Sequence, residues 1–575
     1  MDKYGYYKES LRNFFTSKWF FIFLFLFALF PRGFAASRIS ITNIEAENLL
    51  FLSDSFENFR STYSPIHHLY FRIIDFLFVR NLLALRFLSV VSGSMAVLLP
   101  YLFRNQLGQT SASWLALFLL LDPFLNANSV LAVSYSMTIL LSAFLIFSLV
   151  KEKINKVVVF AFALFLSGPG SIFLIVGILL FFLSVFLIRK KSLVNFLKSL
   201  KEKINIQSLD KSKIALALLF LIAVVFFIFQ NDGGISLGFQ PFFEHLPGPY
   251  GFGNYPVVYP FLIIGYLPFF IFTIFLSSSN STERIRNALP FWIAVFFLLL
   301  FIMVNPGHQY YDLVWISIPM AVLSAEINEF KDLLYSKNQP LSIILFCIGV
   351  TSLLINIAAL INSIQAGAFY TDVLATIGFI LLLISAGVIF LGYLFSYCFA
   401  WKIFRTSLLV VFLIIQIGIS FRSLAVGNKP ERELVWNGYF QDKEIIIPLY
   451  NEIKKNFLGT SGSATIEIEE TANPALLWYL AGEKIRYGYA AYLGDSNFVF
   501  SGSTGFLENR KDFFQQEFVM ESYPKWTWHP VRSFLSADFW SWFFWRDGQL
   551  SRQYYSMFVR NDLFYTSYDG SELNR

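Results

Sequence analysis

The chain has 575 residues, of which 56% are hydrophobic, 19% are aromatic and only 14% are charged. A soluble domain carries about 25% charged residues, so this composition excludes an ordinary soluble protein and indicates that lipid surrounds most of the chain. The net charge of +6 does not indicate nucleic-acid binding, because the basic residues lie in short segments between apolar runs. Cys347 and Cys398 both fall in or beside apolar runs, which argues against disulfides and a cysteine metal site.

The apolar runs predict a mainly α fold, a polytopic membrane protein with about 13 transmembrane helices. The first run is interpreted as a retained span, because more spans follow it and no clean signal-peptide cleavage site stands out. The predicted spans are 19–36, 83–103, 111–122, 130–150, 156–168, 171–188, 213–229, 257–276, 288–304, 310–326, 341–362, 372–395 and 406–422.

Lysine and arginine alternate between the short loops, which predicts the orientation of the chain in the membrane. The N-terminus carries Lys3, Lys8, Arg12 and Lys18, and every second loop after it is basic. We therefore expect a multi-pass protein of a prokaryotic plasma (inner) membrane, with a cytoplasmic N-terminus and an extracytoplasmic C-terminus. The intervening short loops without lysine or arginine are 123–129, 169–170, 230–256, 305–309 and 363–371.

Two external segments are large, and they divide the chain into a transmembrane domain, 1–423, and an extracytoplasmic domain, 424–575. The first external segment, 37–82, ends in apolar residues at helical spacing over 66–83, which predicts an amphipathic helix in the membrane interface. The C-terminal segment mixes strand-like and helix-like runs, so we expect a small α/β domain there. The strand-like runs are 444–447 and 463–468, and the helix-like runs are 448–456 and 474–480.

Three segments at the start of the chain occur in a recognisable order. They read Asn-Ile-Glu-Ala-Glu-Asn-Leu over 43–49, Ser-Pro-Ile-His-His-Leu-Tyr over 64–70 and Leu-Ala-Leu-Arg from residue 83. The order resembles the GT-C glycosyltransferases of the protein O-mannosyltransferase and lipid A aminoarabinose-transferase type. The stretch from Asp122 to Tyr135 is similar to the family's second external loop. The family usually has Asp where this chain has Ile44.

The resemblance implies a GT-C-like fold and an enzyme that moves a sugar from a polyprenyl-phosphate donor to an acceptor on the outer face. A carboxylate must then take the acceptor's proton, for which Glu45 is the first candidate and Glu47 the alternate. The two could also share a divalent metal ion through hard oxygen ligands. The alternative is structural: solvated loop carboxylates, or the first turn of a helix.

Other site residues follow from the same resemblance. His67 and His68 are candidates to line the donor pocket, with interfacial hydrogen bonding as the alternative. Arg72 and Arg86 are candidates to hold the lipid phosphate, with snorkelling to the interface as the alternative. The remaining donor-binding candidates at the outer ends of spans are Asp122, Tyr135, Glu244, His245, His308 and Tyr310. The loop 247–259 is a lid or an ordered connector.

A second class of function stays open beside the enzyme. A non-catalytic GT-C-like scaffold, or a transporter or flippase-associated protein, would share the architecture. A transporter would need charged, discontinuous helices in mid-membrane, whereas the acidic residues here concentrate outside the spans. Ile44 in place of the family's usual Asp favours the scaffold. The expected partners are membrane lipid, a polyprenyl-phosphate sugar donor and an acceptor, without nucleic acid.

Overall fold

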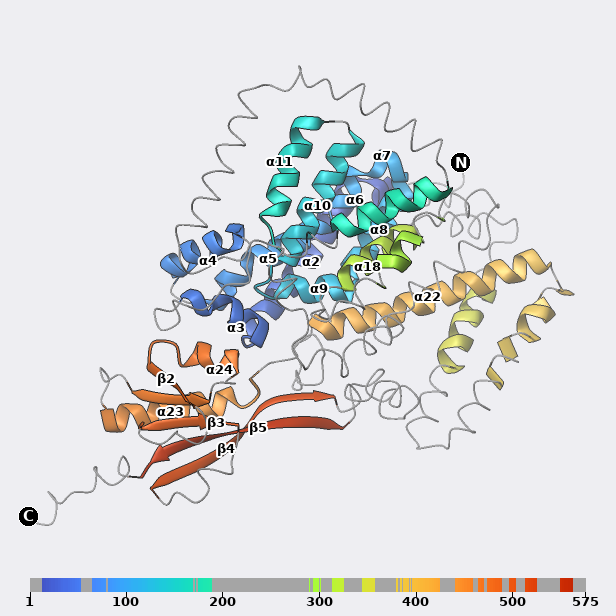
Figure 1. The fold of residues 1–575 in the computed structure, drawn as a ribbon. Helices are drawn as coiled ribbons and strands as arrows, with labels where there is room; N and C mark the ends of the chain where they lie inside the picture. Colours follow the sequence, from blue (N-terminus) through green and yellow to red (C-terminus); the bar gives the residue numbers. More distant parts are fainter. Residues whose placement is uncertain are drawn as a thin grey trace, which may run out of the picture.

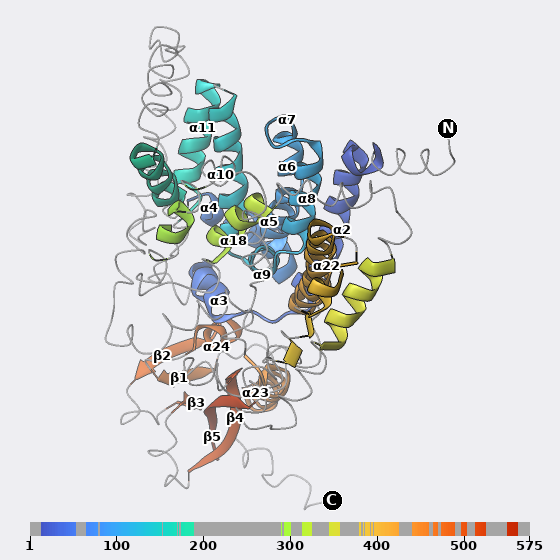
Figure 2. The ribbon, with the colours of Figure 1, turned by 90° about the vertical axis from the view of Figure 1, so that its right-hand side faces the viewer.

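The computed structural model describes residues 13–52, 65–78, 81–151, 153–168, 174–188, 313–324, 344–356, 396–424, 440–458, 464–469, 473–488, 496–502, 512–524 and 549–561, with isolated positions at 171, 289–300 and 379–394. These residues form a helical part and a five-stranded sheet. Figure 1 shows the short helix α3 (Asn43–Leu49) between the two, and the turned view in Figure 2 agrees. The predicted mainly α fold with a small sheet is confirmed.

The helical part is built around one apolar core. It contains the long first helix α2 (Lys18–Arg38), which the Ser17 side chain caps at its N-terminus. Buried residues of α2 pack with those of the helices that follow it in the chain. These helices are α5 (Leu82–Ala96), α6 (Leu99–Leu102), α8 (Gln109–Leu120), α9 (Pro123–Val130), α10 (Tyr135–Val150) and α18 (Val314–Ser324). Partly buried side chains of α7 (Arg104–Leu107) and α22 (Tyr397–Leu424) pack against this core, and α11 (Ile154–Phe165) packs beside α10.

Several described helices coincide with predicted spans. Helix α2 is long and apolar enough to cross a membrane, and the bent pair α8–α9 passes the same test as one broken span, in a search limited to the described residues. Shorter apolar helices, among them α5, α10 and Ile344–Asn356, also fall on predicted spans. The runs 213–229 and 257–276 lie outside the described residues. The number of spans and their orientation therefore stay predictions.

The chain bends sharply where a loop was expected. Helices α8 and α9 meet at an angle of 57° across Leu121 and Asp122, and every residue of α9 is buried. Residues 123–129, predicted as a loop between spans, are therefore helical, while their place relative to the membrane stays a prediction. Pro123 occupies the first helical position and the Asp122 side chain caps the helix, so the sequence starts a new helix instead.

Helix α4 (Pro65–Phe78) confirms the predicted amphipathic helix within the first external segment. One side packs into the protein, where Phe71 is buried and the Tyr70 hydroxyl donates to the Ala84 carbonyl at 2.6 Å. The other side leaves large apolar side chains exposed, as expected of a helix that lies against lipid. These exposed residues are Leu69, Ile73, Phe76, Leu77 and Phe78.

The sheet has the strand order β2-β1-β3-β5-β4. Strand β1 pairs in parallel with both β2 and β3, while β5 runs antiparallel to β3 and β4. The predicted strand at 463–468 and helix at 474–480 are confirmed as β1 and α24. The elements are α23 (Lys443–Leu458), β1 (Thr465–Glu469), α24 (Pro474–Tyr479), β2 (Lys484–Gly488), β3 (Phe498–Ser501), β4 (Phe513–Pro524) and β5 (Leu550–Arg560).

The predicted strand at 444–447 is wrong, because these residues begin α23. A run of isoleucines favours a strand locally. The side chains that α23 buries are Ile446, Tyr450 and Ile453, which recur at i, i+4 and i+7. That helical spacing extends into the predicted helix at 448–456 and decides the local structure.

A second apolar core joins the first external segment to the sheet. It contains Leu49 from α3, Phe71 from α4 and Leu85 from α5, together with Ile466 and Phe500 from the sheet. Burying apolar surface across this boundary stabilises the contact between the two parts. The C-terminal elements therefore pack against the helical part through α3.

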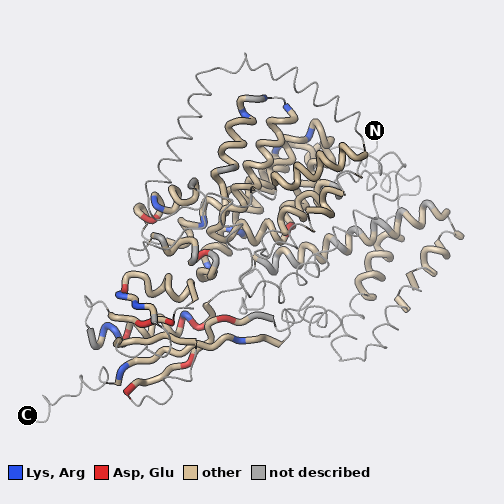
Figure 3. Tube along the Cα trace, in the orientation of Figure 1, with Lys and Arg blue, Asp and Glu red and all other residues tan. Residues whose placement is uncertain are grey.

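Charge is distributed unevenly over the described chain. Figure 3 shows that most of the helical part carries neither acidic nor basic residues, whereas the sheet and its helices carry both. The turn between α10 and α11, which holds Lys151 and Lys153, lies at the end of the helical part away from the sheet. This separation is the one that the predicted orientation requires.

Gly93 allows α5 and α9 to approach closely, and this contact can be tested. A Cβ at Gly93 would lie 1.9 Å from Ser129 Oγ and 3.3 Å from Ser129 Cα. We expect Gly93→Ala to lower the free energy of unfolding by about 1–3 kcal/mol, because overpacking forces the helices apart. Thermal unfolding in detergent measures this. Gly418→Ala in α22, which meets open space, is the matched control, and equal melting temperatures for both variants would contradict the close contact.

Candidate functional site

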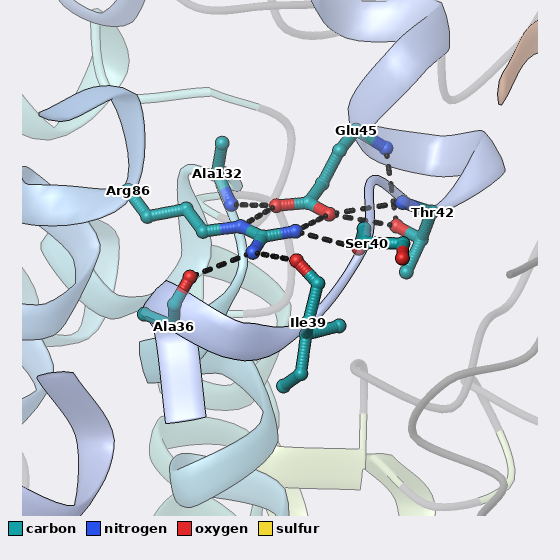
Figure 4. Close-up of polar contacts among 7 residues, drawn as sticks. All are labelled: Ala36, Ile39, Ser40, Thr42, Glu45, Arg86 and Ala132. Atoms are coloured by element: carbon teal, nitrogen blue, oxygen red, sulfur yellow. Dashed lines mark hydrogen bonds and ion pairs between the residues drawn. The ribbon is translucent and has the colours of Figure 1, made fainter. Parts of the chain in front are cut away.

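The centre of the candidate site is a buried ion pair between Glu45 and Arg86 (Figure 4). Both side chains are fully buried, and Arg86 reaches the carboxylate with two nitrogens. Arg86 Nε donates to Glu45 Oε1 and Nη2 donates to Oε2, each at 2.7 Å. This bidentate geometry is the strong form of the arginine–carboxylate interaction.

Glu45 accepts further hydrogen bonds from two parts of the backbone. The Ala132 N–H, in the link between α9 and α10, donates to Oε1 at 2.7 Å. The Thr42 N–H and hydroxyl donate to Oε2 at 3.1 and 3.2 Å, while Thr42 in turn caps the N-terminus of α3. Thr42 and Glu45 thus form a capping box, which fixes the first turn of α3.

Arg86 uses its remaining donors on the end of the first span. Its Nη1 donates to the carbonyls of Ala36 and Ile39 at 2.8 and 2.7 Å, and Nη2 donates to the Ser40 carbonyl at 2.9 Å. Helix ends leave carbonyls without intrahelical partners, and Arg86 satisfies them here. A guanidinium has five N–H donors, so Glu45 and the three carbonyls occupy all of them.

These contacts correct two expectations from the sequence. Glu45 was expected on an accessible loop, but it is buried in a helix with both oxygens occupied. Arg86 was expected to face the lipid phosphate, but no N–H is left to donate to a phosphate oxygen. These contacts favour the structural alternative that the sequence left open for Glu45.

A second buried polar cluster lies between α2 and α9. Arg32 donates through Nε and Nη2 to Asn126 Oδ1, at 3.0 and 2.7 Å. Asp122 accepts from the N–H groups of Phe124 and Leu125 through Oδ1, at 2.8 and 3.0 Å. The predicted site residue Asp122 is therefore buried and caps α9.

The site residues predicted from the sequence do not include Arg32. It lies inside α2, a helix long and apolar enough to cross a membrane, where an ionisable residue is by itself a signal of function or of a specific internal partner. Its Nη1 atom has no hydrogen-bond partner in the part of the chain that the structure describes. Two arginines thus connect α2 to other segments: Arg32 from within the helix and Arg86 at its C-terminal end.

His67 and His68 are both buried in α4. Burial lowers the pKa of His67 to about 3. Burial, and secondly the positive charge of Arg72, lower the pKa of His68 to about 4. Both imidazoles are therefore neutral at pH 7, whereas the Arg72 side chain is exposed on the same helix.

The other predicted site residues are placed only in part. Tyr135 begins α10, and Glu47 lies in α3, where its side chain is outside the described residues. Among the described residues no group of three or more His, Cys, Asp or Glu side chains could hold a metal ion. Four predicted site residues and the loop 247–259 lie outside the described residues. The four residues are Glu244, His245, His308 and Tyr310.

The chain is similar in fold to two solved structures of ArnT from Cupriavidus metallidurans. The apo structure is 13% identical with a TM-score of 0.49, and the structure bound to undecaprenyl phosphate is 12% identical with a TM-score of 0.49. Each match covers 81% of this chain and 85% of the ArnT chain. No protein-family model matches the chain, and no curated protein matches it.

The ion pair predicts a large loss of stability for Glu45→Gln. The substitution leaves the buried Arg86 without its counter-charge, which typically destabilises by about 3–5 kcal/mol. The measurement is thermal or denaturant unfolding of the purified protein in detergent. Glu444→Gln, at an exposed position of α23, is the control and should change stability by less than about 0.5 kcal/mol. A Glu45→Gln protein as stable as this control would show that the pair is not a junction.

The histidines predict a loss of stability in acid. An unfolded histidine has a pKa of about 6.5, so below that pH the unfolded state binds a proton that folded His67 does not. Stability should be complete above pH 6.5 and fall toward the folded pKa, by about 1.4 kcal/mol per pH unit for His67. Melting temperatures between pH 7.5 and 4.5 measure the slope. His67→Gln should reduce the slope by about 1.4 kcal/mol per pH unit and leave the part that His68 contributes, and an unchanged slope would contradict the neutral buried imidazole.

Proposed function

We propose that this chain is a membrane glycosyltransferase that takes a sugar from a polyprenyl-phosphate donor and passes it to an acceptor at the outer face of the membrane. The observation that carries the proposal is the position of α3. This carboxylate-bearing helix lies between the apolar helical part and the charged sheet, and it contacts both. Lipid-linked substrates and water-soluble acceptors can meet only at such a boundary.

Sugar transfer needs a carboxylate that accepts a proton and cationic groups that stabilise the leaving phosphate. The acceptor hydroxyl gives its proton to a carboxylate as its oxygen attacks the anomeric carbon. The bond from that carbon to the phosphate oxygen breaks, and the polyprenyl phosphate leaves with the electron pair. The carboxylate needs an open oxygen for this role, and cationic donors must stabilise the phosphate.

The contacts reverse the order in which the sequence ranks the two carboxylates. Both Glu45 oxygens are occupied, so we assign proton transfer to Glu47, two residues further along α3. Glu45 and Arg86 then position that helix instead of reacting. Arg72, exposed on α4 beside the apolar face of that helix, is the cation that we assign to the lipid phosphate.

A scaffold without catalytic activity is the second candidate. The occupied oxygens of Glu45, together with Ile44 at the position of the family's usual Asp, favour it. In that case the contacts of Glu45 would stabilise the fold and have no role in a reaction. The two candidates differ in whether any carboxylate of α3 affects turnover at constant stability.

Sugar transfer by the purified protein decides between them. Polyprenyl-phosphate-linked aminoarabinose and mannose, each labelled in the sugar, are offered with lipid A and with peptide acceptors. We expect Glu47→Gln to lower kcat by about 10²–10⁴-fold, the usual effect of removing a general base, with little change in melting temperature. Arg72→Gln should raise KM for the donor.

Glu444→Gln serves again as the control and should transfer sugar at the wild-type rate. Wild-type turnover that Glu47→Gln leaves intact would remove Glu47 from the mechanism. A folded wild-type protein that transfers no sugar from either donor would favour the scaffold.

A further inference from the structure

The sheet contacts the chain beside the Glu45–Arg86 pair. Residues 40–43 connect the end of α2 to α3, and we call them the connecting segment. Asn43 is the first residue of α3, and its side chain donates through Nδ2 to Glu521 Oε1 of β4. Asn43 Oδ1 accepts from the Ala475 N–H of α24 at 3.3 Å. One side chain of the connecting segment therefore binds two elements of the C-terminal part.

Glu521 receives a second donor from its own side of this boundary. Asn473, which caps α24 through its Oδ1, donates through Nδ2 to the same Glu521 oxygen. The Glu521 carboxylate is largely buried and has lost water as a hydrogen-bond donor. The two side-chain amides take the place of that water. Glu521 thus joins α3 to α24 through one oxygen.

Tyr479, the last residue of α24, lies close to the same segment. Burial raises the pKa of its hydroxyl, and the nearby Ile41 backbone and Ser40 side chain partly offset that rise. The Ser40 carbonyl is one of the groups that accept from Arg86. The sheet therefore reaches the ion pair through one intervening residue.

Helix α3 needs this support. It has only seven residues, and a helix of two turns is not stable in water without tertiary contacts. Thr42, Glu45 and Arg86 fix its first turn, but they also depend on the path of residues 40–43. Whatever holds that path sets the direction in which the rest of α3 points.

We propose that Glu521, Asn473 and Tyr479 are positioning residues through which the C-terminal sheet holds the connecting segment and orients α3. The sheet is in this view part of the site's framework and not a separate binding module. The effect on turnover rests on the function proposed above, whereas the effect on α3 does not. Proton-transfer geometry would suffer before donor binding, because Arg72 lies on another helix.

Hydrogen–deuterium exchange on the full-length protein in detergent tests the structural half without any assay of activity. Glu521→Leu leaves two buried amides without an acceptor, and Tyr479→Phe removes only a hydroxyl. We expect exchange over 39–50 to become about tenfold faster in either variant, with unchanged exchange in β1 and β5. Glu521→Gln keeps the acceptor oxygen and should stay within about twofold of wild type.

Glu517→Gln, an exposed position on the same strand, is the matched control and should leave exchange over 39–50 unchanged. Wild-type exchange over 39–50 in both Glu521→Leu and Tyr479→Phe overturns the proposal. If Glu521→Leu also makes exchange in β1 and β5 faster, the sheet itself is disturbed, and the exchange of Tyr479→Phe over 39–50 alone tests the proposal. For an active protein, kcat should fall in Tyr479→Phe while KM for the donor holds. If exchange over 39–50 is faster in the two variants but the wild-type protein transfers no sugar, the positioning role is supported and only the proposed activity is rejected.

Discussion

The buried pair of Glu45 and Arg86 is the interaction on which the junction between the helical part and the sheet depends. One guanidinium satisfies carbonyls at the end of α2 and holds the carboxylate that begins α3. The same carboxylate receives the Ala132 N–H from the link between α9 and α10. Four chain segments thus meet at two side chains. Neither charge could stay buried alone, because an unpaired ion in this environment is several kcal/mol less stable than a paired one.

The rest of the helical part follows a simpler rule. Apolar side chains fill the core, and several buried hydroxyls donate to carbonyls one turn earlier in their own helix, as Ser142 does to Thr138 and Ser184 does to Leu180. Such local bonds satisfy a polar group without requiring a partner from another helix. Long-range polar contacts are made at Arg32, at Arg86 and at the connecting segment, and also by the side chains of Ser89, Ser113, Gln416 and Ser420, which donate to carbonyls of other segments. Those few contacts fix how the helices are arranged relative to one another.

The sequence predicts the elements of this fold better than its contacts. Apolar runs place α2, α5 and α10 because their length and composition are local properties. Local chemistry also marks the start of α3: Thr42 and Glu45 have the spacing of a capping box, which already favours the structural reading of Glu45. The partner Arg86 lies 41 residues further along the chain and cannot be assigned from spacing.

The assignment of the catalytic carboxylate turns on an energy balance. A general base contributes about 10²–10⁴-fold to a rate, which corresponds to roughly 3–5 kcal/mol of barrier. If Glu45 accepted the proton, Arg86 would lose its counter-charge inside the protein, at a free energy of about the same size. The gain from base catalysis would then be cancelled by the penalty at the ion pair. A carboxylate outside the ion pair does not meet this penalty, which is why the proposed mechanism gives proton transfer to α3 outside the pair and gives the pair the role of holding that helix in place.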